Sequence, residues 1–546
     1  MRLKRSALVA GLAASALVLS ACGGGNDNGG NDNGGTETGA AGGEGSEGII
    51  TVNGTEPQNA LIPADTNEVG GGKILDLIFA GLVSYEPDGE TVNEIAEDFE
   101  SDDDLTWTIT IEDGWEFTNG DPVDAESFVN AWKDGAYRLN SYFFEAIEGF
   151  DEEEESELTG LEVIDDHTFE VTLTEEQPDF PLRLGYSAYY PLPASAFDDI
   201  DAFGQNPIGN GPYMLDGDDA WQHDVQIDLV PNPDYDGVRQ AQNGGVTISF
   251  YETLDSAYND LLSDQLDVLD AIPDSAFATY QDELEDRWVS QGAAIFQSFT
   301  MSVDLDHFGM DEEGRLRRAA ISQAINREEI TDTIFEGTRE PAHDFTSPVV
   351  AGFSEDIPGN EVLDYDPEKA KELWDEADEI SPYEDTFTIG YNADGGHDAW
   401  VEAVTNSIRN TLDIEAEGKS YPGFNELRTD ITERTIDGAF RTGWQADYPS
   451  MSNFLGPLYA TGAGSNDGDY SNETFDQLVK EGNALVVDDE DAAIEKFSQA
   501  QEELFKDLPA IPLWYATATG GWSNNVENVE FGWNSVPVYH LITKEG

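Results

Sequence analysis

The chain has a single cysteine among its 546 residues, and this limits how it can be stabilised. One thiol cannot form an intramolecular disulfide, so the folded state must depend on hydrophobic burial. A chain of this length can supply it, because large proteins bury about three-quarters of the surface that they expose when unfolded. Cores stop growing beyond about 250–300 residues, and we therefore expect two or more domains.

The position of that cysteine predicts export. Basic residues open the chain, and an uncharged apolar run follows over residues 7–19. The run is shorter than the about 20 apolar residues of a membrane-spanning helix. Leu19-Ser20-Ala21-Cys22 directly after it matches the lipobox of bacterial lipoproteins. We expect a signal peptide over 1–21 and a lipid on Cys22 that anchors the protein to the outer face of the cell membrane. An ordinary cleaved signal with an incidental cysteine is the alternative.

Residues 22–48 contain little that could be buried. They are mainly Gly, Asn, Asp, Glu, Thr and Ser. Such a composition is typical of flexible linkers, so we expect a tether between the lipidated cysteine and the folded body.

The net charge is −88, from 113 Asp plus Glu against 25 Lys plus Arg. Negative charge of this size repels nucleic acid and anionic lipid, so we expect no nucleic-acid partner and a membrane contact through the lipid anchor only. Repulsion between surface acids weakens when the Debye length falls to about 3 Å in 1 M salt. A high-salt habitat is our hypothesis, and a merely acidic surface protein is the alternative.

The body is expected to fold despite its charge, because it has 11 Trp, 20 Tyr and 27 Phe, which disordered acidic chains lack. Apolar–polar alternation predicts strands over 105–111 and 168–173. Capping patterns predict helices that begin after Asp124, Asn326 and Asp366. Helical patterns also cover residues 316–325 and 490–505. The mixture, without a regular strand–helix alternation, favours an α/β chain with large irregular lobes.

Seven short matches in a fixed order carry a resemblance to a known family. They are Asn53-Gly54-Thr55-Glu56-Pro57, Ile78 to Val83, Gly114 to Pro122, Gly209 to Tyr213, Arg317 to Arg327, Arg441 to Pro449 and Leu508 to Leu513. From about residue 49 to residue 544 the chain resembles the extracellular solute-binding proteins of oligopeptide and dipeptide ABC importers.

The resemblance implies a two-lobed, periplasmic-binding-protein-like α/β fold whose lobes close on a ligand. The first lobe would comprise 49–300 and 510–546, with an extra subdomain at 91–206, and the second lobe would comprise 301–509. It also implies a monomer that is not an enzyme, that has a peptide as its ligand and that delivers it to the transmembrane subunits of an ABC permease.

The match around Asp447 implies a binding site. In peptide-binding relatives an aspartate at this position pairs with the peptide α-ammonium group, and an amine in a dry cleft needs such a carboxylate. Trp444 would contact ligand side chains, Gln445 would hold the ligand backbone, and Tyr448 lies beside the acid. Arg441 would reach the peptide carboxylate, with a structural ion pair as the alternative. For Asp447 the alternative is one more surface acid.

The first lobe would contribute two further segments. Ala80, Gly81, Leu82 and Val83 would pair with the ligand through their backbone, as an added strand does. The commonest family pattern has a glutamate where Ala80 stands, so a contact through that side chain is not expected. Tyr142 would belong to an aromatic wall of the cleft, and burial in the core is the alternative.

Motifs of catalysis are missing from the sequence. It has no Gly-x-Ser-x-Gly motif and no phosphate-binding Gly-rich loop, and its six histidines show no paired zinc spacing. We expect no catalytic residue, no metal and no cofactor. Three functions stay open: capture of oligopeptides or dipeptides for import, capture of another solute such as a nickel chelate or a sugar oligomer, and an extracellular hydrolase or structural surface lipoprotein.

Overall fold

The computed structural model describes residues 47–66, 68–151, 158–393, 396–486 and 489–546. The predicted signal peptide, the lipidated Cys22 and all but the last two residues of the predicted tether lie outside these ranges. Residues Gly45–Gly546 form one compact unit. Within the described ranges, no helix is both long enough and apolar enough to cross a membrane.

One large sheet runs through the described body. Its strands lie in the order β16 (Ala416–Tyr421), β15 (Phe387–Asn392), β17 (Ala439–Gln445), β13 (Trp288–Thr300), β18 (Ala510–Trp522), β12 (Val268–Leu269), β1 (Ile49–Gly54), β11 (Gly245–Phe250), β10 (Gln226–Pro231) and β8 (Tyr213–Leu215), with β14 (Arg339–Pro341) beside β18 and β9 (Trp221–Gln222) beside β10. The central strands β17, β13 and β18 are antiparallel, whereas β1 and β15 pair with neighbours in parallel.

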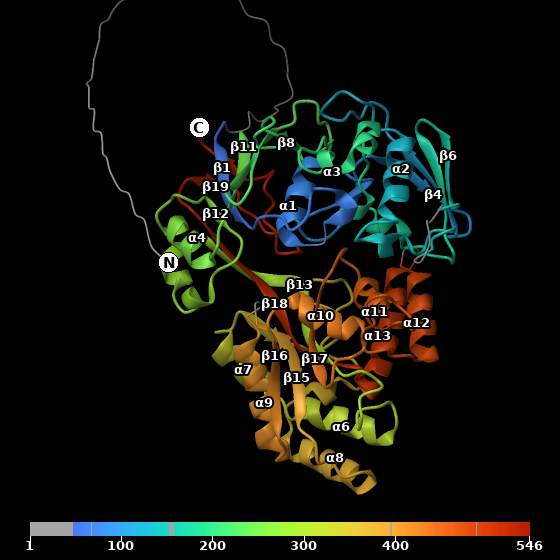
Figure 1. Cartoon of the computed structure of the whole chain (residues 1–546), viewed down its shortest axis with the longest axis vertical. Helices are drawn as coiled ribbons and strands as arrows, with labels where there is room; N and C mark the ends of the chain where they lie inside the picture. The colour runs from blue at the N-terminus through green and yellow to red at the C-terminus, as the bar shows by residue number, and fades with distance from the viewer. Residues whose placement is uncertain (1–46, 67, 152–157, 394–395, 487–488) are drawn as a thin grey trace, which may run out of the picture. The chain divides into compact units, whose positions relative to one another are not determined.

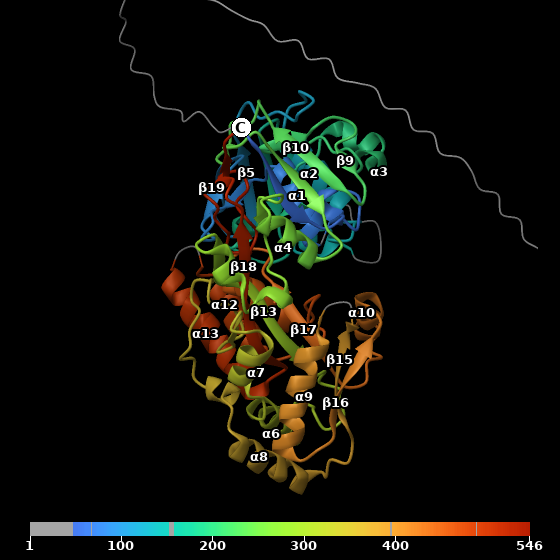
Figure 2. The same ribbon diagram turned by 90° about the vertical axis from the view of Figure 1, so that its left-hand side faces the viewer.

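Two hydrophobic cores share this sheet, and the long strands β13 and β18 pass from one to the other (Figure 1 and Figure 2). Along β13, Ala293 belongs to the first core and Ala294 to the second. Along β18, Tyr515 belongs to the second core and Ala518 to the first. We call the parts built around these cores the first and the second lobe. The lobe limits predicted at 300 and 510 stay a prediction.

The first lobe holds a second, smaller sheet. Its strands are β4 (Ala96–Glu100), β5 (Thr106–Ile111), β7 (Thr168–Thr172) and β6 (Leu161–Asp165), in that order, and they fall within the range predicted for an extra subdomain. The helix α2 (Ala125–Gly135) packs against β6 and β7, and the first lobe also contains α1 (Val69–Ile78), α3 (Ile200–Phe203) and the hairpin of β2 (Val83–Tyr85) and β3 (Thr91–Asn93). Asp124 caps α2 by accepting a hydrogen bond from the Ser127 amide, as predicted.

A smaller cluster joins α4 (Leu254–Leu262) and α5 (Tyr280–Leu284) beside the crossing strands, and the short strands β19 (Val526–Glu527) and β20 (Thr543–Lys544) lie near the C-terminus. The second lobe contains the helices α6 (Glu312–Gln323), α7 (Arg327–Ile334), α8 (Pro367–Ile380), α9 (Asp398–Leu412), α10 (Phe424–Thr432), α11 (Met451–Tyr459), α12 (Glu473–Asn483) and α13 (Glu490–Asp507).

The predicted helix starts in the second lobe are confirmed at two caps. Asn326 accepts a hydrogen bond from the Glu329 amide, and Asp366 accepts one from the Lys369 amide. The helix predicted over 316–325 begins a turn earlier, at Glu312. The reason is Asp311, whose carboxylate accepts a hydrogen bond from the Gly314 amide and so caps the helix upstream of its apolar positions.

Buried arginines hold the second lobe to the crossing strands. Arg318 donates to the carbonyl oxygens of Met301 at 2.9 Å and Leu508 at 2.8 Å, which lie just after β13 and just before β18. Arg327 donates to the Pro512 carbonyl at 2.8 Å. The sequence match that runs from Arg317 to Arg327 therefore has a structural role in this chain.

Candidate functional site

The end of β17 carries most of the predicted contact residues. β17 pairs with β13 so that Trp444 lies opposite Phe296 and Gln445 lies opposite Ile295. These partners directly follow Ala294, where β13 enters the second core. Residues that leave the end of β17 therefore emerge where the two lobes meet.

Asn453, in the first turn of α11, organises this turn. Its Oδ1 atom accepts hydrogen bonds from Trp444 Nε1 at 3.0 Å and from the Asp447 amide at 2.8 Å. Its Nδ2 atom donates to Asp447 Oδ2 at 3.1 Å. One buried amide thus sets the position of both the Trp444 ring and the Asp447 carboxylate. The sequence analysis missed Asn453, for which the only signal was its place three residues after the cap Ser450.

Asp447 is a half-buried carboxylate at the junction of the lobes. Burial raises its pKa to about 6, and the hydrogen bond from Asn453 acts in the opposite direction. Among the residues that the structure describes, no lysine or arginine forms an ion pair with it. A carboxylate removed from water gains most from a cation that replaces the lost hydration, so this position favours a positively charged ligand group.

Tyrosine side chains of the first lobe surround this carboxylate. Burial raises the pKa of Tyr85 and of Tyr186, and the negative charge of Asp447 adds to the rise in both. The Tyr448 ring is buried and lies 5.7 Å from the Arg183 guanidinium carbon, so Tyr448 packs against the first lobe. Aromatic faces attract cations, and their presence strengthens the preference for a positive group.

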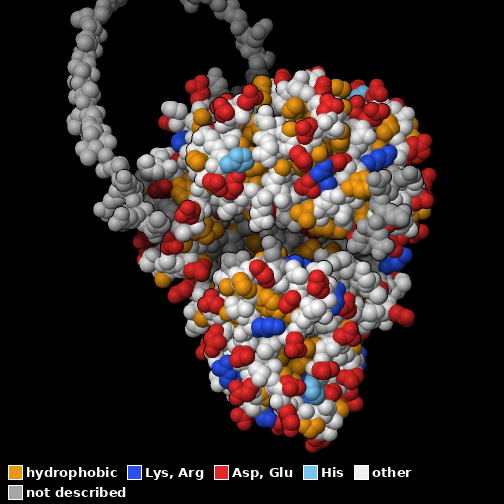
Figure 3. Space-filling view, viewed as in Figure 1, with side chains coloured by type: hydrophobic (Ala, Val, Ile, Leu, Met, Phe, Trp, Pro, Cys, Tyr) orange, Lys and Arg blue, Asp and Glu red, His pale blue; other side chains and the backbone are white. Residues whose placement is uncertain are grey.

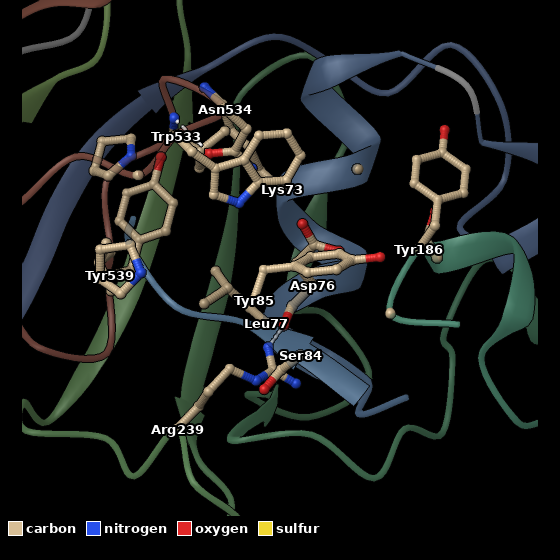
Figure 4. A pocket seen from close by; sticks show the side chains of 18 of the residues that line it. Lys73, Asp76, Leu77, Ser84, Tyr85, Tyr186, Arg239, Trp533, Asn534 and Tyr539 are labelled. Atoms are coloured by element: carbon tan, nitrogen blue, oxygen red, sulfur yellow. Dashed lines mark hydrogen bonds between the residues drawn. The ribbon is translucent and has the colours of Figure 1, made fainter. Parts of the chain in front are cut away.

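A first cavity of about 430 Å³ opens beside Asp447. The second lobe contributes residues 445–447 to its lining. The first lobe contributes α1, the end of β2, residues 185–187 and the C-terminal segment 532–541 (Figure 4). The visible face in Figure 3 is hollowed where the lobes meet, and acidic side chains are spread over both of them.

A second cavity of about 520 Å³ lies on the other side of the β17 end. Its lining includes Trp444 and Arg441 from β17, the facing side of β13, and residues of α10. Tyr142 contributes from the first lobe, and its side chain is 41% exposed rather than buried in the core. Trp444 thus faces the second cavity, while Gln445 and Asp447 face the first.

Arg441 lines the second cavity and contacts Asn392 and Phe424 there. Its Nε atom donates to Asn392 Oδ1 at 2.8 Å, and its guanidinium carbon lies 5.0 Å from the centre of the Phe424 ring. The nearby Arg428 and Arg434 form ion pairs with Asp467 and Asp469 respectively.

The segment 532–541, near the C-terminus, forms one wall of the first cavity. The sequence analysis did not predict this contribution. The Trp533 amide donates to the Pro87 carbonyl at 2.8 Å, and the Ala294 amide donates to the Trp533 carbonyl at 2.9 Å. Gln445 Nε2 donates to the Asn534 carbonyl at 3.4 Å. The segment therefore contacts the first-lobe hairpin, the crossing strand and the second lobe at one place.

Residues 90–466 match the family described as bacterial extracellular solute-binding proteins, family 5 Middle. The chain belongs to this family. Family membership makes it an extracytoplasmic solute-binding protein and not an enzyme, as the resemblance implied. The hydrolase alternative is thereby set aside.

Similar proteins span nearly the whole chain. The dipeptide-binding protein DppE of Bacillus subtilis is 26% identical over 500 residues, which cover 86% of this chain and 87% of that protein. The periplasmic oligopeptide-binding protein OppA of Salmonella typhimurium is 26% identical over 490 residues, with coverage of 86% and 87%. The structure of the Escherichia coli murein tripeptide binding protein MppA has a TM-score of 0.75 at 20% identity, over 91% of this chain and 98% of that one. This solute-binding protein therefore has the two-lobed α/β fold that was predicted.

The predicted backbone segment Ala80, Gly81, Leu82 and Val83 does not line either cavity. All four residues are buried in the first lobe, where Asn210 exchanges two hydrogen bonds with the Ala80 backbone and the Leu82 carbonyl accepts from the Glu94 amide. Several of their backbone groups, among them both those of Ala80 and the Leu82 carbonyl, are thus paired within the solute-binding protein. The residues that follow them, Ser84 and Tyr85, line the first cavity.

The match from Gly209 to Tyr213 supports that buried segment. A Cβ atom on Gly211 would lie 2.6 Å from the Ile78 carbonyl carbon, so a glycine allows the two backbones to approach.

In the described part of the chain, no group of three His, Cys, Asp or Glu side chains is arranged to hold a metal ion.

Proposed function

We propose that this solute-binding protein is the lipid-anchored receptor of an ABC importer, and that it captures oligopeptides or dipeptides between its lobes and delivers them to a membrane permease. The observation that supports this most directly is Asp447. It is a half-buried carboxylate at the lobe junction that lines the first cavity and has no basic partner in an ion pair among the described residues. The names of the similar proteins, which bind dipeptides, oligopeptides or a murein tripeptide, agree with a peptide ligand.

In the proposed mechanism, the peptide α-ammonium group forms an ion pair with Asp447. The ammonium loses its hydration when the lobes close, and the carboxylate compensates for that loss. Asn453 holds the carboxylate in place, so little side-chain entropy is lost on binding. The rings of Tyr85 and Tyr186 line the same space and exclude water from it.

The rest of the peptide would extend from Asp447 past Trp444 into the second cavity. There the Trp444 and Tyr142 rings offer apolar surface to ligand side chains. Arg441 would meet the carboxylate of a peptide of suitable length, because a guanidinium binds a carboxylate with two parallel hydrogen bonds. Gln445, exposed at the junction, is available to the ligand backbone.

Calorimetry with defined di- to hexapeptides and their N-acetylated forms tests the role of Asp447. Acetylation removes the positive charge, so we expect it to weaken binding by about 100-fold or more, since hydrogen-bonded charge pairs that lose one partner cost 2–5 kcal/mol. Asp447→Asn should weaken the binding of free peptides to a similar extent and remove the effect of acetylation. Asp437→Asn, at an exposed position just before the same strand, is the matched control and should bind as the parent does. Equal affinity of Asp447→Asn for free peptides would refute the proposal, as would tight binding of a nickel chelate or a sugar oligomer alone.

The lipid anchor and the permease need a test in cells. Cys22→Ala should release the mature protein into the medium or the soluble fraction, and peptide uptake should fall although the purified variant binds peptide normally. Retention of the variant in the membrane fraction would refute the anchor. Normal peptide uptake in a strain without the permease genes would refute delivery to an ABC importer.

A further inference from the structure

A second carboxylate, that of Asp76, lines the first cavity together with Asp447. Asp76 is half-buried on α1, a helix whose other face packs Ile74, Leu75 and Ile78 into the first core. Figure 4 shows its carboxylate directed toward the space that the Tyr85 and Tyr186 rings also face. Its Oδ1 atom accepts a hydrogen bond from the Tyr190 hydroxyl at 2.9 Å.

Tyr186 relates this carboxylate to that of Asp447. Burial raises the pKa of Tyr186, and the charges of Asp447 and Asp76 both add to the rise. Tyr186 lines the first cavity together with both of these aspartates. A ligand whose amine is bound at Asp447 would place its first side chain in the same cavity, on the side of Asp76.

The basic groups in the lining of this cavity pair with other carboxylates, but burial raises the pKa of Asp76 and the nearby Arg239 charge partly offsets that rise. Lys73 forms an ion pair with Asp270. The Arg239 guanidinium donates to both carboxylate oxygens of Glu94, at 2.9 and 3.1 Å, and to backbone carbonyls that include that of Asp76. Burial, together with Arg239, lowers the pKa of His540 to about 4, so it is neutral at pH 7. The lining also carries the acids Glu68 and Glu86, so the cavity has an excess of negative charge.

We propose that the first cavity binds the side chain of the first residue of the ligand and prefers a lysine or arginine there, with Asp76 as its partner. This inference rests on the proposed function, because it takes the ligand amine to be at Asp447. An uncharged side chain would add nothing to the Tyr190 hydroxyl and the Arg239 charge that partly offset the burial of the Asp76 carboxylate. A basic side chain pairs with that carboxylate and places its cation against the faces of Tyr85 and Tyr186.

Three peptides of equal length separate these cases: Lys-Ala-Ala, norleucine-Ala-Ala and Glu-Ala-Ala, measured by calorimetry at pH 7 and one fixed salt concentration. Norleucine has the lysine stem without its charge. We expect the lysine peptide to bind about 10- to 100-fold more tightly than the norleucine peptide, as a hydrogen bond to a charged group is worth about 1.5–3 kcal/mol. The glutamate peptide should bind most weakly, because its carboxylate meets Asp76.

Asp76→Asn keeps the shape of the side chain and removes its charge. We expect it to bring the ratio between the lysine and norleucine peptides close to one, while the norleucine peptide keeps or gains affinity. Asp76→Ala is a second variant, in case the asparagine amide itself binds the ligand. Asp88→Asn is the matched control, because Asp88 is exposed near the same cavity without lining it. It should keep the full ratio.

The outcomes distinguish this inference from the proposed function. If none of the three peptides binds the parent protein, the proposed function fails and the inference fails with it. If all three bind with similar affinity, the peptide function stands and the preference is wrong. If the lysine preference persists in both Asp76 variants, Asp76 is not the partner and the inference is overturned.

Discussion

Peptide binding should weaken sharply in mild acid, because Asp447 must be ionised to hold an amine. Burial raises its pKa to about 6 in the ligand-free protein. A bound ammonium group favours the ionised carboxylate and lowers that pKa again, so binding below pH 6 has to displace a proton. The expected direction is therefore a loss of affinity as the pH falls through about 6, with little change above pH 7.

The magnitude follows from the fraction of Asp447 that is ionised. With a pKa of about 6, the ratio of protonated to ionised carboxylate is about 10 at pH 5 and about 0.1 at pH 7. The apparent dissociation constant should thus rise about tenfold between pH 7 and pH 5. An aspartate with an ordinary pKa of about 3.9 would change it by less than about 10% over the same range.

Calorimetry of norleucine-Ala-Ala at half-unit steps from pH 7 to pH 5 measures this dependence. Its uncharged first side chain avoids a charge pair with Asp76, and repeating the series in Asp76→Asn removes the titration of that second carboxylate. Repeating the pH 5 point in two buffers of different ionisation enthalpy counts the released protons, which should be about 0.9 per peptide. Asp447→Asn should bind weakly at every pH with a flat profile. A parent profile that is flat to pH 5, or an equal slope in the variant, would refute the role given to this carboxylate.

Three further predictions concern the support of the site and the stability of the body. Asn453→Ala should weaken peptide binding about tenfold and move the pH midpoint upward, because the hydrogen bond that lowers the pKa of Asp447 is lost; calorimetry measures both. Arg318→Met should lower the free energy of unfolding by about 3–5 kcal/mol in urea, since buried carbonyls lose their donor, whereas Lys371→Met in an exposed pair should change it by less than about 0.5 kcal/mol. The melting temperature should rise from dilute buffer to molar NaCl as the charge of −88 is screened, and a constant value would remove the high-salt hypothesis.

Local signals in the sequence were sufficient for most elements of the fold. Asp124, Asn326 and Asp366 cap helices because each side chain accepts a hydrogen bond from the amide three residues later. Both partners lie within a short stretch of sequence, so the pattern can be recognised there. The start of α6 was placed too late because the apolar pattern begins after its cap. Asp311 caps this helix, but the sequence has so many acidic residues that a single aspartate did not stand out as a cap.

The site was harder to predict, because its residues are joined by contacts between distant segments. Asn453 reaches Asp447 and Trp444 only through the turn that follows β17, and Asp76 comes to the same cavity from a helix some 370 residues earlier in the chain. The segment at Ala80 illustrates a further limit. The sequence match covers Ile78 to Val83, but it does not show which residues of this part of the chain reach the cavity. Asn210 bonds the backbone of Ala80, and β3 pairs with the strand that begins at Val83. The first residue after the match that lines the cavity is Ser84.

Trp533 should control how firmly the lobes are joined without deciding which peptide binds. Its ring is buried in the second core, but its amide is bonded to Pro87 of the first-lobe hairpin and its carbonyl to Ala294 of the crossing strand. Trp533→Leu keeps these backbone groups but removes much of the ring packing, and it should lower the melting temperature, since Trp→Ala in a core costs about 3–5 kcal/mol and leucine replaces part of the volume. The Trp533 ring lines the first cavity and packs edge-on against Tyr85, with ring centres 5.7 Å apart, so both Lys-Ala-Ala and norleucine-Ala-Ala should bind more weakly. The ratio between them should stay well above one, because the Asp76 carboxylate is unchanged. A ratio that fell to one in this variant would mean that the preference depends on the Trp533 ring and not on Asp76, and the assignment of Asp76 would then be wrong.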